Sequence, residues 1–122
     1  MTEASIFLPW PDRRLSPNAR QHWASLARAK RQAKQEAYYT AIEAGLGKIE
    51  AETVLVRYSF YPPSRRAYDL DNLVASMKAA ADGIAMAIGI DDSRWNLAVS
   101  PRGPVEKNGM VKVDIEWTEV AE

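Results

Sequence analysis

The chain of 122 residues contains no cysteine, and its single histidine is His22. A disulfide framework, a thiolate zinc site and a cysteine nucleophile are therefore excluded, and one histidine cannot build a histidine-based metal cluster. No apolar run approaches eighteen residues, and the first residues lack a basic segment followed by an apolar one. We therefore expect a soluble intracellular protein that has no membrane partner, with His22 at the surface or capping a helix.

The chain also has no net charge, but its two halves are oppositely charged. Residues 1–66 hold eleven Lys and Arg against six Asp and Glu, whereas residues 67–122 hold five against ten. The segment 13–34 holds seven basic residues and no acidic one. Such a run favours a phosphate-facing surface, and the plainer alternative is a solvated helix face. The DNA-binding candidates in this run are Arg13, Arg14, Arg20, Arg28, Arg31 and Lys34.

Length and a 47% hydrophobic content indicate one small domain covering residues 1–122. Alternating apolar positions predict strands, helical spacing predicts helices, and Pro with Gly predicts a turn at 101–104. The predicted strands cover 4–8, 53–61, 95–100 and 111–117, and the predicted helices cover 19–44 and 73–88. The expected fold is therefore α+β, in the order β-α-β-α-β-β, with a mixed sheet flanked by two main helices.

Each predicted helix has a face suited to packing. The first has a face of mostly small side chains, which allows close approach to a sheet or a partner helix: Leu26, Ala29, Ala33, Ala37 and Ala41. The second has apolar residues at spacings of three and four, which predict a core face: Leu73, Met77, Ala80, Ile84 and Ile88. The aromatic residues of the first helix are expected to pack rather than to stack on bases: Trp23, Tyr38 and Tyr39.

Two acidic clusters bracket the second predicted helix. Asp69 and Asp71 precede it, and the pair Asp91 and Asp92 follows it. A hard divalent ion such as Mg²⁺ takes oxygen ligands from carboxylates, waters and phosphates, so this arrangement favours a metal site. The plainer alternative is that the first cluster caps the helix and the second forms a solvated turn.

Basic residues accompany the acidic clusters. Arg65 and Arg66 come shortly before Asp69, and their guanidinium groups suit phosphate oxygens. Lys78 and Asp82 follow Asp71 by seven and eleven residues, close to two and three helical turns, so the three side chains are expected on one stripe. The plainer role for Lys78 is an ion pair with Asp82 on the helix surface.

The residues from Arg65 to Leu73, then Lys78 and Asp82, then Gly89 to Ser93 resemble the RusA family of Holliday junction resolvases. These proteins are small phage-derived endonucleases. The segment Ile6 to Pro11 is also similar to the family's N-terminal strand and proline turn. The likeness covers most of the chain, and the arrangement of an Asp-x-Asp-Asn motif followed by an Asp-Asp pair is fairly specific.

The resemblance implies that Asp69, Asp71 and Asp92 are catalytic residues that bind metal, since they match the family's Asp-x-Asp pair and the second aspartate of its later pair. The family's helix lysine often lies four residues after the second aspartate, where this chain has Ala75. We assign that catalytic role to Lys78, about one turn further along the same face. Asp91 and Asp82 are expected to support these ligands or to replace them.

The resemblance further implies a Mg²⁺-dependent endodeoxyribonuclease, with Mn²⁺ as a substitute ion. Such an enzyme resolves four-way DNA junctions by paired nicks during DNA recombination and repair, as a homodimer in the cytoplasm of a bacterial cell, with a prophage origin of the gene left open. Two alternatives stay open. One is a metal-dependent nuclease for another branched DNA, and the other is a non-catalytic branched-DNA-binding module, which the displaced lysine favours.

Overall fold

A computed structural model describes residues 2–20, 22–100 and 103–118. It confirms the predicted α+β class and the predicted order of strands and helices, except that the second predicted helix is divided into two. The elements are β1 (Thr2–Pro9), the 3₁₀ helix η1 (Arg13–Leu15), α1 (Trp23–Glu43), β2 (Val54–Tyr61), α2 (Leu70–Ser76), α3 (Lys78–Ile88), the 3₁₀ helix η2 (Asp92–Arg94), β3 (Trp95–Ser100) and β4 (Met110–Trp117).

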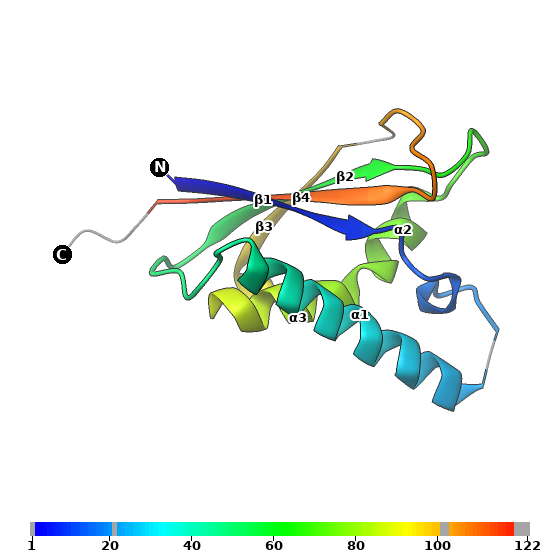
Figure 1. Ribbon diagram of the computed structural model, residues 1–122, viewed down its shortest axis with the longest axis horizontal. Coiled ribbons are helices and arrows are strands. Elements are labelled where there is room, and N and C mark those ends of the chain that lie inside the picture. Colours follow the sequence, from blue (N-terminus) through cyan, green and yellow to red (C-terminus); the bar gives the residue numbers. More distant parts are fainter. Residues whose placement is uncertain (1, 21, 101–102, 119–122) are drawn as a thin grey trace.

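The four strands form one mixed sheet in the order β1-β4-β2-β3. β4 runs antiparallel to both of its neighbours, while β2 and β3 are parallel. A parallel pair needs a crossover connection, and α2 with α3 provides it between β2 and β3. Figure 1 shows α1 and α3 together on one side of this sheet.

The core lies between the sheet and these two helices. Alternate residues of β2 and β4 are buried, as the sequence pattern predicts for strands with one covered face. α3 contributes Ile84 and Ile88, and α1 contributes Ala37 and Ala41. The buried residues of the two central strands are Val54, Val56, Tyr58, Phe60, Val111, Val113 and Ile115.

α1 approaches α3 closely, because small residues meet at the crossing. A Cβ atom placed on Gly83 of α3 would lie 2.2 Å from the backbone carbonyl oxygen of Lys34 and 3.1 Å from the backbone nitrogen of Tyr38. Ala29, Ala37 and Ala41 are the buried residues of α1. The predicted small-residue face therefore serves close packing.

α1 extends beyond this crossing at its N-terminal end. Figure 1 shows the first turns of α1 projecting past the end of α3. The prediction that the α1 aromatic residues all pack is therefore wrong for two of them, because Trp23 is 75% exposed and Tyr39 is 60% exposed. Tyr38 does pack against the core. His22 caps α1 as predicted, since its Nδ1 accepts a hydrogen bond from the backbone N–H of Ala24 at 3.2 Å.

The second predicted helix is divided at Met77. The Ser76 hydroxyl donates a 2.7 Å hydrogen bond to the Asn72 carbonyl, and the Met77 backbone N–H donates to Val74 rather than to the residue four positions before it. Serine bonds of this kind bend helices, and the tighter turn that follows separates α2 from α3. Ser76 is also the one buried polar residue of the described chain.

The predicted turn at 101–104 includes residues 101 and 102, which lie outside the described residues. Its described part contacts β2, since the backbone N–H of Gly103 donates to the carbonyl of Phe60 at 2.8 Å. Across the described residues, none of the helices has the length and apolar character needed to cross a membrane.

The crossing of α1 on α3 gives a first prediction. Gly83→Ala should lower the free energy of unfolding by about 1–3 kcal/mol, because the new methyl group meets the backbone of Lys34 and cannot displace it without moving α1. This loss should appear although alanine favours helix more than glycine does. Urea denaturation followed by circular dichroism measures it.

Gly47→Ala is the matched control, since a Cβ at Gly47 meets no atom within 4 Å. This variant should stay within about 0.5 kcal/mol of the wild type. Equal stability of both variants would contradict the tight crossing.

Candidate functional site

The first acidic cluster forms the N-terminal end of α2. Asp69 is the N-cap residue, and its Oδ1 accepts hydrogen bonds from the backbone N–H groups of Asp71 at 2.9 Å and of Asn72 at 3.3 Å. The capping alternative is thereby confirmed for Asp69. Asp71 lies in the first turn and is exposed. Negative charge at this position is stabilised by the partial positive charge of the helix N-terminus.

The second acidic cluster has a capping residue followed by an ion-paired one. Asp91 is the N-cap of η2, and its Oδ2 accepts a hydrogen bond from the backbone N–H of Ser93 at 3.1 Å. Hydrogen bonds from Ser93 hold the pKa of Asp91 below its usual value. The solvated-turn alternative is thereby confirmed for Asp91. Asp92 instead turns its carboxylate to Lys78.

Lys78 joins two aspartates from different parts of the chain. Its Nζ lies 2.6 Å from Oδ2 of Asp92 and 2.9 Å from Oδ1 of Asp82. Of the predicted stripe, the pair of Lys78 and Asp82 is confirmed, whereas Asp71 lies in α2, on the other side of the break at Met77. Asp92 joins the pair across fourteen residues of sequence. The hydrogen bonds to Asp92 and then to Asp82 raise the pKa of Lys78 well above its usual value. Lys78 is therefore a fixed positive charge and not a base near neutral pH.

The buried phenol of Tyr58 lies close enough for these charges to shift its pKa. Tyr58 of β2 is 3% exposed. Burial raises the pKa of Tyr58 far above its usual value, and the negative charge of Asp92 raises it further. The phenol therefore stays protonated near neutral pH.

The predicted metal ligands are not assembled as a group of three. Carboxylate oxygens are the donors that Mg²⁺ prefers, so the residue types are suitable. Among residues 2–20, 22–100 and 103–118, however, no three His, Asp or Glu side chains lie close enough together to hold a metal ion. An oxygen of Asp69 caps α2, and Asp92 is paired with Lys78. The described residues of a single chain therefore do not form a three-carboxylate metal site in this arrangement.

A groove of about 440 Å³ brings the first acidic cluster together with the segment after β1. We name it the loop groove. Its wall includes Arg13 from η1 and Arg66 and Asp69 from the segment before α2, so residues more than fifty positions apart share one surface. The Trp10 and Tyr68 rings pack at 5.1 Å in the same wall, and the Arg66 guanidinium lies 4.8 Å above the Tyr68 ring.

A second groove, of about 750 Å³, lies between the N-terminal half of α1 and the beginning of α3. We name it the helix groove. Lys30, Arg31 and Lys34 of α1 line it, together with Lys78 and Asp82 of α3. The sequence prediction missed Lys30, although it lies in the basic run and one helical turn before Lys34. Basic side chains therefore line the α1 side of this groove.

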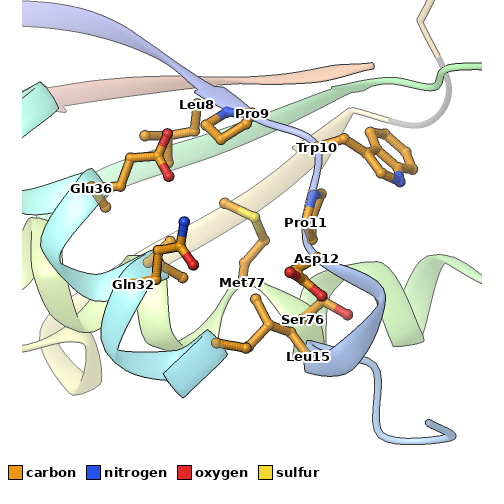
Figure 2. A pocket seen from close by; sticks show the side chains of 14 residues that line it. Leu8, Pro9, Trp10, Pro11, Asp12, Leu15, Gln32, Glu36, Ser76 and Met77 are labelled. Carbon is orange, nitrogen blue, oxygen red and sulfur yellow. The ribbon is translucent and has the colours of Figure 1, made fainter. Parts of the chain in front are cut away.

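The two grooves meet. Ser16, Ala19 and Ser76 line both of them. A third cavity, of about 290 Å³, lies between β1, α1 and the junction of α2 with α3, and Ser76 lines it as well. Figure 2 shows Ser76 and Met77 in this cavity, with Gln32 and Glu36 on the α1 side. The junction of α2 and α3 is therefore the point at which all three hollows come together.

The other predicted DNA-binding residues are placed differently. Arg14 lines the helix groove, but its guanidinium is 2.9 Å from Asp12, whose hydrogen bonds with Arg14 hold the Asp12 pKa below its usual value. Arg20, Arg28 and Arg65 are exposed and line neither groove.

No family model matches the chain. An uncharacterized protein of Xylella fastidiosa (strain Temecula1) is 44% identical to it over 94 residues, which covers 75% of this chain. The match covers 61% of that relative, so the chain spans less than two thirds of the relative's length. The similarity shows a related sequence in this bacterium without naming an activity.

The raised pKa of Lys78 gives a second prediction. Since the folded pKa lies above the unfolded value of about 10.4, the ion pairs contribute fully below that pH and are lost only as the pH rises through the folded pKa. Lys78→Met should therefore lower the free energy of unfolding by about 1 kcal/mol or less, and by the same amount at pH 7 and pH 9. Urea denaturation at pH 7, 9 and 11 measures the difference, which should shrink at pH 11.

Lys107→Met, at an exposed lysine between β3 and β4, serves as the control and should leave stability unchanged at each pH. A Lys78→Met difference that already disappears between pH 7 and pH 9 would show that the ammonium is not held by its two aspartates.

Proposed function

We propose that the protein is a structure-specific endodeoxyribonuclease of the RusA type, which acts on branched DNA and makes paired nicks in four-way junctions during recombination and repair. The observation that carries the proposal is the meeting of the two grooves at Ser76. It connects a basic surface on α1 with the end of α2 that holds Asp69 and Asn72. A DNA backbone bound along the basic surface of α1 would therefore pass the end of α2.

The charge pattern supports a polyanionic substrate. Lys30, Arg31 and Lys34 are exposed on the same part of α1, and no acidic residue occurs between Arg13 and Lys34. Contacts from such residues to phosphates release counterions from DNA, and this effect provides affinity without regard to base sequence. Recognition of a branch by its shape requires binding of this kind.

The chain's own residues supply positive charge near a bound phosphate. Lys78 lines the helix groove and keeps its ammonium charge, which would stabilise phosphoryl oxygens once the phosphate replaces Asp82 or Asp92 as its partner. Mg²⁺, with Mn²⁺ as a substitute, belongs to the proposal as the expected cofactor, and Asp69, Asp71 and Asp92 are its proposed ligands. Among the described residues, these carboxylates do not form one group.

A homodimer is part of the same proposal. A four-way junction has approximate two-fold symmetry, and a two-fold dimer would present an equivalent site to each of two strands. Paired nicks would follow from this match.

A second candidate function is a branched-DNA-binding module without catalysis. The observation that favours it is the position of Lys78, which neutralises Asp82 and Asp92 while Asp69 caps α2. The basic groove would then be sufficient for the function. Cleavage assays separate the two candidates directly, and a comparison of junction, flap and duplex substrates separates a resolvase from another branched-DNA nuclease.

The third prediction tests the nuclease proposal. Wild type should nick a labelled four-way junction with Mg²⁺ or Mn²⁺ and not with chelator. Asp71→Asn should reduce cleavage about 100-fold or more, since a lost carboxylate removes several kcal/mol of transition-state stabilisation. Junction binding should stay equal or become tighter, because the substitution also removes repulsion between Asp71 and phosphate. Gel assays of cleavage and binding measure both.

Asp114→Asn is the matched control, because Asp114 lies in β4 and accepts a hydrogen bond from Ser5, which an amide oxygen can also accept. It should cleave like the wild type. A fully active Asp71→Asn protein would show that Asp71 is not a catalytic residue. Tight junction binding by a wild type that cleaves with neither ion would favour the binding module and make Ala75→Lys the variant to test.

The fourth prediction concerns the helix groove. Replacing Arg31 and Lys34 together by Gln should weaken binding to junction and duplex alike, and should reduce the slope of log K against log salt by about 0.9 for each lost phosphate contact. Fluorescence anisotropy at several salt concentrations measures the slope.

Arg28→Gln is the matched control, since Arg28 is exposed on α1 but does not line the groove. It should change the slope by less than half of the change in the double variant. Unchanged affinity in the double variant would show that this part of α1 is a solvated helix face and not a DNA-binding surface.

A further inference from the structure

Trp23 is a large aromatic side chain left in solvent within the basic segment. It is the first residue of α1 and is 75% exposed, more than any other large hydrophobic residue of the described chain. His22 caps the helix through Nδ1, and the His22 ring lies 5.4 Å from the Trp23 ring with the two planes only 31° apart. The indole therefore extends from the start of α1 into solvent, with the His22 ring as its neighbour.

Trp23 lies on the same side of α1 as the helix groove. Lys30 and Lys34 follow it by seven and eleven residues, close to two and three helical turns. Along the helix axis these separations are about 10 Å and 16 Å. Both lysines line the helix groove. The three residues therefore form a row in which an aromatic ring continues a line of positive charges.

A flat ring beside a basic groove is the combination with which proteins bind unpaired nucleic acid strands. The groove follows the phosphates, and the ring stacks on a base, which every nucleotide presents. We propose that Trp23 stacks on an unpaired DNA base while the adjoining strand lies along the helix groove. The inference rests on the proposed function and adds the part of a branched DNA that this end of the protein recognises, namely unpaired bases at or near the branch.

The charges around Trp23 favour this occupant over a protein partner. Seven basic residues and no acidic one lie between Arg13 and Lys34. A two-fold contact between copies of the chain would bring this positive segment against itself, because an isologous interface uses the same patch on both subunits. Like charges brought together in this way repel each other. A polyanion with exposed aromatic bases can pair its negative charge with the basic residues and can stack a base on the indole ring.

The test compares Trp23→Ala, Trp23→Phe and the wild type in binding to a labelled single strand, to a duplex with a single-stranded overhang and to a blunt duplex of equal length. Trp23→Ala should weaken binding to the first two by roughly 5- to 150-fold, the range of a lost base stack. Its affinity for blunt duplex and its salt slope should stay unchanged. Trp23→Phe should recover much of the loss, because phenylalanine keeps a stacking face.

Tyr39→Ala is the matched control, because Tyr39 is another exposed aromatic residue of α1, 60% exposed and sixteen residues further along the helix. It should bind all three DNAs like the wild type. A second readout is quenching of intrinsic fluorescence by the single strand. The quenching should be larger in the wild type than in Trp23→Phe, which retains the other three tryptophans.

Three results would overturn the inference. They are equal single-strand affinity of Trp23→Ala and the wild type, an equal loss on blunt duplex, and a change of oligomeric state in Trp23→Ala by analytical ultracentrifugation. The last would make a second copy of the chain the occupant. A wild type that binds no DNA at all would overturn the proposed function instead, so the two failures are distinguishable.

Discussion

The arrangement of the molecule depends on the contact between the backbones of α1 and α3. Gly83 lets α3 approach the carbonyl of Lys34 more closely than any side chain would permit. Ala37 and Ala41 are buried near this crossing, Ala29 is the buried residue of α1 nearest its N-terminal end, and Lys30 and Trp23 are exposed. The helix groove lies along this exposed part of α1, with α3 and the segment around η1 as its other walls. The close approach at Gly83 thereby fixes the position of α1, and with it the position of the basic residues on its exposed side.

Much of the fold follows from local patterns. The alternation in β2 and β4 predicted their buried residues, because a strand with one covered face repeats every two residues. Gly89 ends α3 in a left-handed conformation, the usual role of a glycine that follows an apolar helical repeat. The break at Met77 was not predictable in this way. It depends on the Ser76 hydroxyl bonding to a carbonyl within its own helix, which an apolar period does not report.

In the candidate site, too, contacts within one helix were predictable from the sequence and contacts between distant segments were not. The spacing of Lys78 and Asp82 predicted their contact, since residues four apart on a helix are neighbours. The spacing did not reveal that Asp92 joins them, because that contact depends on how the chain returns after α3. Trp23 was assigned to packing because helical periodicity does not show where a partner helix ends. Whether separate carboxylates gather around one ion likewise depends on the approach of distant segments. The metal and DNA roles remain predictions for that reason.

The strand order has a consequence for biosynthesis. β4 lies between β1 and β2, and its pairing with β1 places Trp117 opposite Thr2, near the other end of the chain. Yet β4 is the last of the four strands to leave the ribosome. Until it arrives, β1 has no neighbour in the sheet, and β2 has an open hydrogen-bonding edge. Long-range pairing of this kind is slow, and unpaired edges associate with other chains. The central strand thus acts as a late closing element, and a nascent chain that stalls before residue 110 should be a target for chaperones that bind exposed strand edges.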